Sequence, residues 1–479
     1  MTTMMKEIVA DDSPIAQEHK RMKKNHHEFD AVVVGAGSSG TSAAFHLAGA
    51  GFKTALLEAG SLKNAGARWI NAVPPWMFDQ AGFERPEPPE LHAKDFPISM
   101  RDSLGNERLR IPINPTWELD MRLLVKRLQG LARESGVIFF EHVHAGKFVC
   151  ENERPTILKA TRKSPKGSTT KMEFRAKLFV DATGLPGVLR AAAPSLANIC
   201  PPASVSDLCA AAQFVYRISD PDGAQRYLEK TDSPSGASIN YFSIDGGFST
   251  LMVKTNLEKN EISVLGGTTA EKGRKTGRVV VEDFVKANSW IGKSLFGGQA
   301  LIPIRRPYDR FAAPGIALVG DAACQVFPAH GSGTGSGMIA GKMLADAAKG
   351  QDDPGSLEAT WNYQAKFMRE IGAVHAAYDV FRKTTQKLTS AEMDRMVSAS
   401  LLLPGASRNT LDQKIPKLEM RDQLPLMRAI SREPLIVARF IPSLAKMQAV
   451  HALYKKYPLR PDERFLWLWT KAAATLFGS

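Results

Sequence analysis

The sequence predicts a mixed α/β (α+β) fold, and three observations support it. A strand, a glycine-rich turn and a helix follow one another over residues 29–50. Strand candidates gather over residues 211–266, and the chain from residue 351 on is helical in pattern, without a glycine-rich ligand motif. We therefore expect an α/β domain, an antiparallel-sheet domain and a helical C-terminal region.

Length and composition indicate a folded protein of two or three structural units. The chain has 479 residues, of which 44% are hydrophobic and 23% charged, so disorder and disulfide scaffolds are excluded. The net charge of +13 favours anionic ligands or surfaces, but no nucleic-acid-binding motif accompanies it. Without an apolar signal region near the N-terminus, a spanning apolar run or paired cysteines, we expect a cytoplasmic protein that uses no metal.

The first motif predicts a Rossmann-like, dinucleotide-binding unit. The strand at residues 29–34 runs into a turn in which Gly35 allows the bend, Gly37 leaves room for a pyrophosphate, and Gly40 allows the helix to pack closely. A second strand ends in Glu58, whose carboxylate can accept hydrogen bonds from ribose hydroxyls. An ordinary βα turn is the alternative.

Two later segments extend this pattern. One strand stops at the turn Asp181-Ala-Thr-Gly184, and a second strand ends in Gly320-Asp321-Ala-Ala. The turn that follows leads into a helix and places glycines at alternate positions, which exposes backbone to a flat ligand. Its candidate site residues are Pro328, Gly331, Gly333, Thr334 and Gly335. For Gly337 and Gly341, close packing between helices is the competing interpretation.

In this order the three motifs resemble the FAD-dependent oxidoreductases of the p-hydroxybenzoate hydroxylase fold, within them the geranylgeranyl reductase and flavin-dependent halogenase branch. The resemblance implies that FAD is the cofactor and that Asp321 binds its ribityl and pyrophosphate part. It also implies that the turn from Pro328 to Gly335 lies against the pyrimidine edge of the flavin, where the helix N-terminus would stabilise negative charge.

The resemblance also implies a domain division. We expect a polar tail at 1–28 and an FAD-binding domain at 29–190, with an embedded substrate-facing segment at 61–115. A substrate-binding sheet domain at 191–300, the second part of the FAD-binding domain at 301–350 and the helical region at 351–479 complete the chain. The expected strands of the sheet domain are residues 211–218, 238–242, 248–254 and 261–266.

Residues between the motifs leave alternatives open. Leucines at helical spacing predict a helix over residues 116–134, capped by Thr116. Arg122 or Arg127 replaces an arginine that often precedes this helix in the family, or else lies on a solvated helix face. Trp69, Trp76 and Phe78 either wall a substrate pocket or belong to the core.

His330 is the catalytic candidate because it is the titratable side chain within the turn at 328–335, where it can shuttle a proton at neutral pH. Capping the helix or facing solvent is the competing interpretation. Three functions stay in view. The first is a reductase or dehydrogenase that moves a hydride between FAD and an apolar small-molecule, lipid-like or carrier-bound substrate, with NAD(P)H or a flavin reductase as electron donor. The second is a monooxygenase or atypical halogenase of secondary metabolism, and the third is a non-catalytic FAD-binding protein.

The halogenases' Trp-x-Trp-x-Ile-Pro motif is replaced by residues 240–245, and their lysine is not evident in residues 63–75. These departures favour the reductase. Residues 408–479 contain 13 Lys and Arg but 6 Asp and Glu, and they include an aromatic run at 465–469. This segment fits peripheral contact with an anionic membrane or an acidic carrier protein, or else a terminal helix that packs its Trp side chains on the core.

Overall fold

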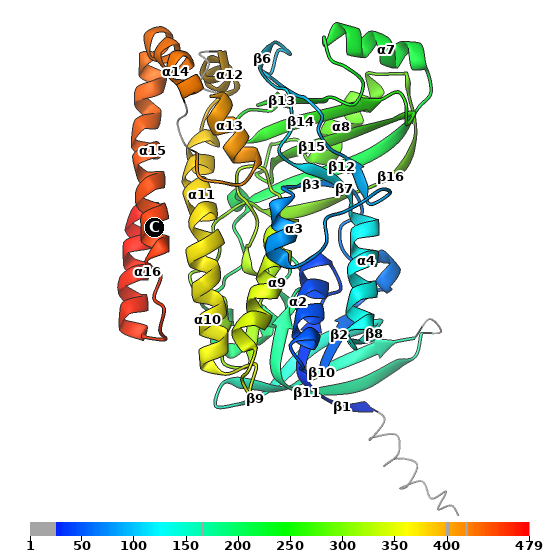
Figure 1. The fold of residues 1–479 in the computed structure, drawn as a ribbon, viewed down its shortest axis with the longest axis vertical. Helices are drawn as coiled ribbons and strands as arrows, with labels where there is room; N and C mark the ends of the chain where they lie inside the picture. The colour runs from blue at the N-terminus through cyan, green and yellow to red at the C-terminus, as the bar shows by residue number, and fades with distance from the viewer. Residues whose placement is uncertain (1–24, 165–166, 399–402, 417–419, 479) are drawn as a thin grey trace, which may run out of the picture.

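Two large sheets and an outer layer of helices make up the molecule (Figure 1). The computed structural model describes residues 25–478 except 165–166, 399–402 and 417–419. In Figure 1 the first sheet fills the lower half, the second lies at the upper right, and the last helices run along the left side. None of the helices in these described ranges combines the length and the apolar character needed to cross a bilayer.

The first sheet has a parallel centre with the strand order β17-β18-β11-β1-β2-β8, and β9 and β10 extend it beside β11. Residues 31–33 of β1 are fully buried, as expected for a strand covered on both faces. The strands are β1 (His26–Val34), β2 (Thr54–Glu58), β8 (Ile138–Glu141), β9 (Val143–Glu151), β10 (Arg154–Lys163), β11 (Thr169–Asp181), β17 (Ala312–Ala313) and β18 (Ile316–Leu318). β1 thus begins before the expected Phe29, since His26–Glu28 already pairs with β11.

Helices cover this sheet and pack closely on one another. They are α2 (Ser38–Gly49), α3 (Trp76–Ala81), α4 (Met121–Glu134), α5 (Val188–Ala192), α6 (Pro194–Ala197) and α9 (Thr334–Ala348). A Cβ on Gly341 would lie 2.6 Å from the Ala43 backbone nitrogen, and one on Gly337 would lie 2.0 Å from Ser39 Oγ. Gly337 and Gly341 therefore allow α9 to approach α2, so the packing interpretation holds for both.

The helix expected over residues 116–134 begins later, and that prediction was wrong at its start. Trp117–Asp120 forms β7, which pairs with β3 (Ile70–Val73) and β4 (Leu91–Ala93) in a three-stranded sheet. Asp120 rather than Thr116 caps α4, since its carboxylate accepts a hydrogen bond from the Arg122 backbone nitrogen at 2.9 Å.

The second sheet has the strand order β16-β12-β15-β14-β13-β5-β6. The four strand predictions fall on its central members, and the one for β13 has the observed bounds. The sheet also recruits β5 and β6 from the segment at 61–115 and the unpredicted edge strand β16. Its strands are β5 (Ile98–Arg101), β6 (Glu107–Ile111), β12 (Leu208–Ile218), β13 (Ser238–Phe242), β14 (Ser249–Asn256), β15 (Glu261–Thr269) and β16 (Ile291–Pro303), and its helices are α7 (Pro221–Lys230) and α8 (Gly277–Lys286).

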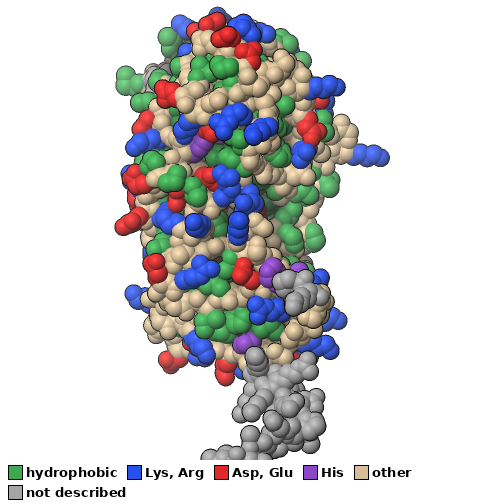
Figure 2. All heavy atoms as spheres, turned by 90° about the vertical axis from the view of Figure 1, so that its right-hand side faces the viewer, with side chains coloured by type: hydrophobic (Ala, Val, Ile, Leu, Met, Phe, Trp, Pro, Cys, Tyr) green, Lys and Arg blue, Asp and Glu red, His purple; other side chains and the backbone are tan. Residues whose placement is uncertain are grey.

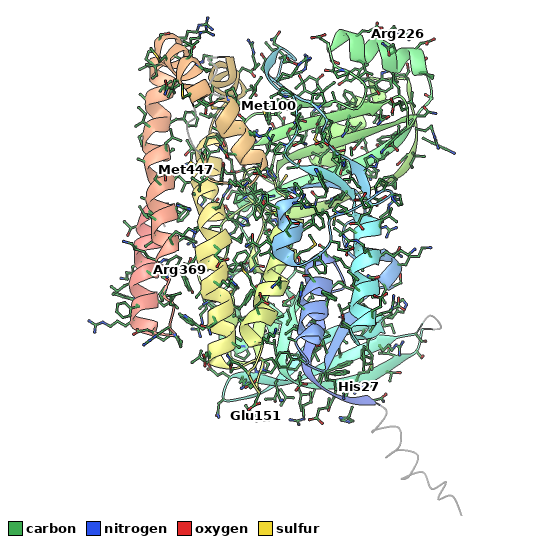
Figure 3. The ribbon with its side chains drawn as sticks, in the orientation of Figure 1. His27, Met100, Glu151, Arg226, Arg369 and Met447 are labelled. Carbon is green, nitrogen blue, oxygen red and sulfur yellow. The ribbon has the colours of Figure 1, made fainter. Side chains whose placement is uncertain are left out.

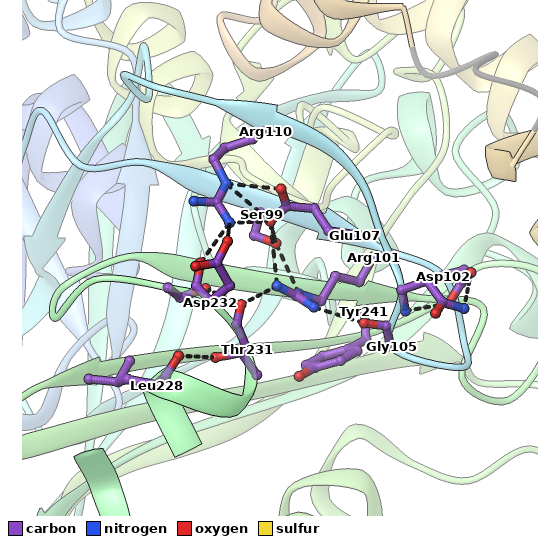
Figure 4. A network of polar contacts seen from close by, with 12 residues as sticks. Ser99, Arg101, Asp102, Gly105, Glu107, Arg110, Leu228, Thr231, Asp232 and Tyr241 are labelled. Atoms are coloured by element: carbon purple, nitrogen blue, oxygen red, sulfur yellow. Dashed lines mark hydrogen bonds and ion pairs between the residues drawn. The ribbon is translucent and has the colours of Figure 1, made fainter. Parts of the chain in front are cut away.

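A polar network ties the β5–β6 hairpin to the rest of this sheet (Figure 4). The Arg101 guanidinium donates to the carbonyl oxygen of Thr231, just beyond α7, and pairs with Glu107 on β6 at 3.4 Å. Glu107 also accepts a hydrogen bond from Ser99 Oγ at 2.6 Å. The hairpin is thereby fixed to an element that follows it by more than a hundred residues.

The C-terminal region is helical, as expected, and forms the outer layer. Its helices are α10 (Leu357–Phe367), a π-helical turn at Met368–Gly372, α11 (Ala373–Thr385), α12 (Ser390–Ser398), α13 (Pro404–Leu411), α14 (Met420–Arg432), α15 (Pro434–Lys455) and α16 (Glu463–Phe477). α15 packs along α11 and α16 packs on α15. Trp469 is buried against Tyr454 and Tyr457, with ring centroids 4.8 Å away in each case, but Trp467 stays exposed.

Candidate functional site

A cavity of about 930 Å³ opens where the parallel strands of the first sheet end. Val34 of β1 lies beside Asp181 of β11, which lies beside Leu318 of β18, so the turns after these strands meet at one edge. Parallel α/β sheets bind ligands outside the carboxyl ends of their strands, and this volume suits a large cofactor.

The structure brings most of the sequence-predicted site residues to this cavity. Its lining includes Gly35, Gly37, Gly40, Glu58, Gly184, Asp321, Gly331, Gly333 and Thr334. The other candidates do not belong to the lining: Asp181, Gly320, Pro328, Gly335 and His330. The three motifs therefore converge, although not every residue of each motif faces the same space.

The first glycine turn is shaped by close backbone contacts. Gly35 has a φ of +106°, and a Cβ there would lie 2.2 Å from the Ala182 carbonyl oxygen. A Cβ on Gly40 would lie 2.0 Å from the Gly35 carbonyl oxygen, whereas one on Gly37 would find only the Cα of Gly66 at 3.5 Å. Among the residues that the structure describes, no side chain caps the N-terminus of α2, so its backbone N–H groups are available to an anion in the cavity.

Glu58 stands at the cavity with its carboxylate already held by the backbone. Its Oε2 accepts a hydrogen bond from the Ala36 backbone nitrogen at 3.0 Å, and its Oε1 accepts one from the Gly60 backbone nitrogen at 2.9 Å. An ionised carboxylate has about four acceptor positions, so it can still accept bonds from a ligand's hydroxyls.

Asp181 forms the second turn instead of facing the cavity. Its fully buried carboxylate accepts hydrogen bonds from Thr183 Oγ1 and from the Arg190 backbone nitrogen, each at 2.7 Å. These bonds hold the turn that carries Gly184 into the cavity lining. Asp181 is therefore a positioning residue in this structure.

Asp321, unlike Asp181, lines the cavity. Its carboxylate faces the cavity, and no hydrogen bond reaches it from any residue in the described part of the chain. The surrounding protein removes water from it, and this desolvation raises the pKa of Asp321 to about 6. An unpartnered carboxylate beside bare backbone N–H groups fits a ligand that carries both hydroxyls and phosphates.

The third turn is fixed from two sides. Thr334 Oγ1 accepts a hydrogen bond from Asn71 Nδ2 at 2.8 Å, and Ser332 Oγ donates to the Ala72 carbonyl oxygen at 3.0 Å. Gly335 instead allows close packing on α3, because a Cβ there would lie 2.2 Å from Met77 Sδ. Gly331, Gly333 and Thr334 thus face the cavity while Gly335 packs on a helix.

His330 lies outside the cavity lining, with its ring centroid 4.7 Å from that of Phe327. His330 is exposed, and the protein atoms around its ring still lower its pKa to about 4 by desolvation. Behind Phe327 lies the buried His375, at 5.7 Å between centroids. The catalytic role of His330 stays a prediction.

Some lining residues were missed or left open by the sequence. Trp69 belongs to the lining and approaches β16, since a Cβ on Gly298 would lie 3.5 Å from its ring. Phe78 is core and Trp76 Nε1 donates to Asp412 instead. Further lining residues come from segments without a ligand motif: Arg68, Asn71, His144, Gly297, Gly298, Gln299, Ala300, Leu301 and Ile302.

Neither candidate arginine on α4 reaches the cavity. Arg127 forms a two-pronged pair with Glu90, at 2.7 and 2.9 Å. Arg122 pairs with Asp120 and stacks over the Phe296 ring at 3.5 Å from its centroid. Two basic side chains do line the cavity. Arg68 lies in the segment after β2, and His144 belongs to β9.

The comparisons with known proteins agree with this geometry. Residues 30–80 match the family described as FAD dependent oxidoreductase. The fold, the cavity and this match define the class: the chain is an FAD-dependent oxidoreductase.

More particularly, the chain is similar to digeranylgeranylglycerophospholipid reductase of Sulfolobus acidocaldarius, with 25% identity over 92% of this chain and 96% of that protein. Among solved structures it is similar to a geranylgeranyl bacteriochlorophyll reductase-like protein of Thermoplasma acidophilum, with a TM-score of 0.68, 15% identity, and 87% of this chain and 100% of that chain covered. It is also similar to a flavin-dependent brominase, with a TM-score of 0.57, 13% identity, and 85% and 98% coverage.

Proposed function

We propose that the cavity holds FAD in one orientation. The N-terminus of α2 would bind the pyrophosphate through its backbone N–H groups, and Glu58 would accept hydrogen bonds from the adenosine ribose. Asp321 would accept hydrogen bonds from the ribityl chain, which supplies the partners that its carboxylate lacks. The turn from Gly331 to Thr334 would then lie against the pyrimidine edge of the flavin.

We further propose that the enzyme is a reductase or dehydrogenase of a largely apolar, lipid-like or carrier-bound substrate. FAD supplies the hydride chemistry. The observation that carries this proposal is the apolar wall beside the third turn, where Trp69 approaches Gly298 and a Cβ on Gly331 would lie 3.7 Å from Ile302. The names of the similar reductases point the same way, so an unsaturated isoprenoid glycerophospholipid is the first substrate to test.

The domain division belongs to this proposal. β5 and β6 come from the segment at 61–115. β5 pairs with β13 of the second sheet and β6 pairs with β5, which supports a substrate-facing role for that segment. The adjoining sheet at 191–300 would then bind the substrate, and 29–190 with 301–350 would bind FAD.

Anaerobic single-turnover stopped flow tests the reaction class. The flavin is reduced chemically, the unsaturated lipid is added in detergent without oxygen, and flavin reoxidation is followed with product analysis. Reoxidation coupled to saturation of one double bond is expected. NADPH, NADH and a reduced-flavin supply are then compared as electron donors, since we propose either NAD(P)H or a flavin reductase in that role.

A monooxygenase or halogenase is the second candidate because the fold is shared with a flavin-dependent brominase. Product that forms only after oxygen is admitted and that carries labelled oxygen or halide would select it. A purified protein that holds FAD but gives no flavin reoxidation with any substrate class would favour a non-catalytic role.

Membrane contact through the basic C-terminal segment completes the proposal, because a lipid-like substrate resides in a bilayer. An acidic carrier protein is the alternative source of the substrate. Reduction of vesicle-embedded lipid compared with carrier-bound substrate distinguishes the two.

A further inference from the structure

The outermost helices expose large apolar side chains at a helical spacing. On α14, Met420, Leu424 and Met427 are 87%, 57% and 66% exposed and follow one another at intervals of four and three residues. Such spacing places them along one side of the helix. A soluble helix normally buries that side, so this one is available to a partner.

α15 continues this surface. Its inner side, with Met447, Val450 and Tyr454, is buried, and Figure 3 shows Met447 on the side that faces α11. Its outer side exposes mainly small or apolar residues at intervals of three and four, namely Ala438, Ile441, Ala445, Ala449 and Ala452. Between Glu433 and Asp462 the sequence contains no Asp or Glu, which is unusual for the exposed side of a helix.

α16 adds aromatic side chains and positive charge. Phe465 and Trp467 are 62% and 56% exposed, and Lys471 Nζ lies 4.5 Å from the centroid of the Trp467 ring. Before α16 come the exposed Lys455, Lys456 and Arg460, which form no ion pair with any residue that the structure describes. Trp beside Lys and Arg is the composition of proteins that rest at a membrane interface.

The acidic residues of this region are already engaged. Over residues 434–479 the sequence has seven Lys and Arg but only Asp462 and Glu463 as acids. The Asp462 carboxylate caps α16 and accepts hydrogen bonds from the Arg464 and Phe465 backbone nitrogens, and Glu463 pairs with Arg310 at 3.0 Å. The side of the molecule in Figure 2 differs, since Lys, Arg, Asp and Glu are interspersed there.

We propose that the exposed side of α14, α15 and α16, termed the outer helical face, binds the surface of an anionic lipid bilayer. Apolar side chains would enter the headgroup region while the lysines and arginines contact lipid phosphates. A second copy of this chain is a poorer occupant, because a two-fold contact through this face would bring like charges together. The inference rests on the proposed lipid-like substrate only for the reason why the protein would bind a bilayer. The arrangement of the exposed residues on the outer helical face does not depend on that substrate.

Vesicle flotation of the FAD-loaded full chain tests the charge. The wild type should float with vesicles that contain phosphatidylglycerol and much less with pure phosphatidylcholine, and high salt should weaken the binding. At about fivefold per lysine, Lys455→Ala with Lys456→Ala should weaken binding about 25-fold. The matched control is Lys286→Ala with Lys293→Ala, two exposed lysines of the second sheet domain.

Flotation also tests the apolar contact, with Phe465→Glu against Leu104→Glu, a residue that is 82% exposed on the β5–β6 hairpin. Only Phe465→Glu should reduce binding, with the flavin spectrum and melting temperature unchanged. Absence of wild-type flotation, or equal loss in the control variants, would overturn the proposal. Reduction of detergent-dispersed lipid is measured in parallel, because its failure would refute the proposed reaction and leave the flotation result valid.

Discussion

Asp321→Asn should stabilise the apoprotein at neutral pH and weaken its affinity for FAD. The carboxylate stands in the cavity without a partner among the described residues, and desolvation raises its pKa to about 6, against about 3.9 in an unfolded chain. The folded state then binds a proton more tightly than the unfolded state, so this group's contribution to stability falls as pH rises from about 4 through about 6.

The magnitude follows from the shift. A difference of about two pKa units corresponds to about 3 kcal/mol, which Asp321 costs the apoprotein above about pH 7 and which is absent below about pH 4. The Asn variant should therefore be up to about 3 kcal/mol more stable than wild type near pH 8 and nearly equal near pH 4. For FAD binding the substitution is unfavourable, because the Asn variant loses a charge-assisted hydrogen bond worth about 1.5 to 3 kcal/mol. Its affinity for FAD should fall at least about tenfold.

Urea unfolding of both apoproteins at several pH values gives the first result, and titration with FAD gives the second. Asp222→Asn, which changes an exposed carboxylate on α7, is the matched control and should alter neither. A stability difference between wild type and Asp321→Asn that is independent of pH would refute the reasoning about Asp321.

The remaining predictions concern Glu58, Gly333 and His330. Glu58→Ala should weaken FAD binding about tenfold or more in apoprotein titrations, through lost charge-assisted bonds; unchanged affinity would contradict it. Gly333→Val should reduce FAD loading in absorbance spectra, because even its Cβ would lie 2.8 Å from Val326 Cγ2. His330→Ala should slow the anaerobic half-reaction about 10²- to 10⁴-fold with FAD still bound, and the wild-type rate should break near pH 4 rather than 6.5. An unaffected rate would remove His330 from the reaction.

The glycine motifs were predictable because their cause is local. Gly35 needs its positive φ for the turn itself, and strand, turn and helix are neighbours in sequence. The same motif pattern could not separate Gly333 from Gly335. One faces the cavity and the other meets Met77, and α3, which carries Met77, lies far from α9 in the sequence.

The start of α4 was missed because two local signals compete. Trp117 to Asp120 continues the leucine spacing of the helix, but it also alternates as a strand, and pairing with β3 and β4 decides the outcome. Asp120 is the stronger cap, since an Asp before a helix satisfies the first backbone N–H groups better than a Thr such as Thr116.

The cavity wall beside the third turn could not be predicted from the sequence, because three separate segments form it. Trp69 precedes β3, Gly298 and Ile302 belong to β16, and Thr334 begins α9. β16 reads poorly as a strand because Gly297 and Gly298 interrupt it, yet a Cβ on Gly297 would lie 2.3 Å from the Gln213 carbonyl oxygen of β12, so the glycine is what allows the two strands to pair. β16 is the edge strand beside β12 in the described sheet, and its residues 297–302 line the cavity. Substrate selectivity should therefore reside in Trp69 and this edge, so that substitutions there change the choice of substrate while the proposed binding of FAD by the first glycine turn stays unaltered.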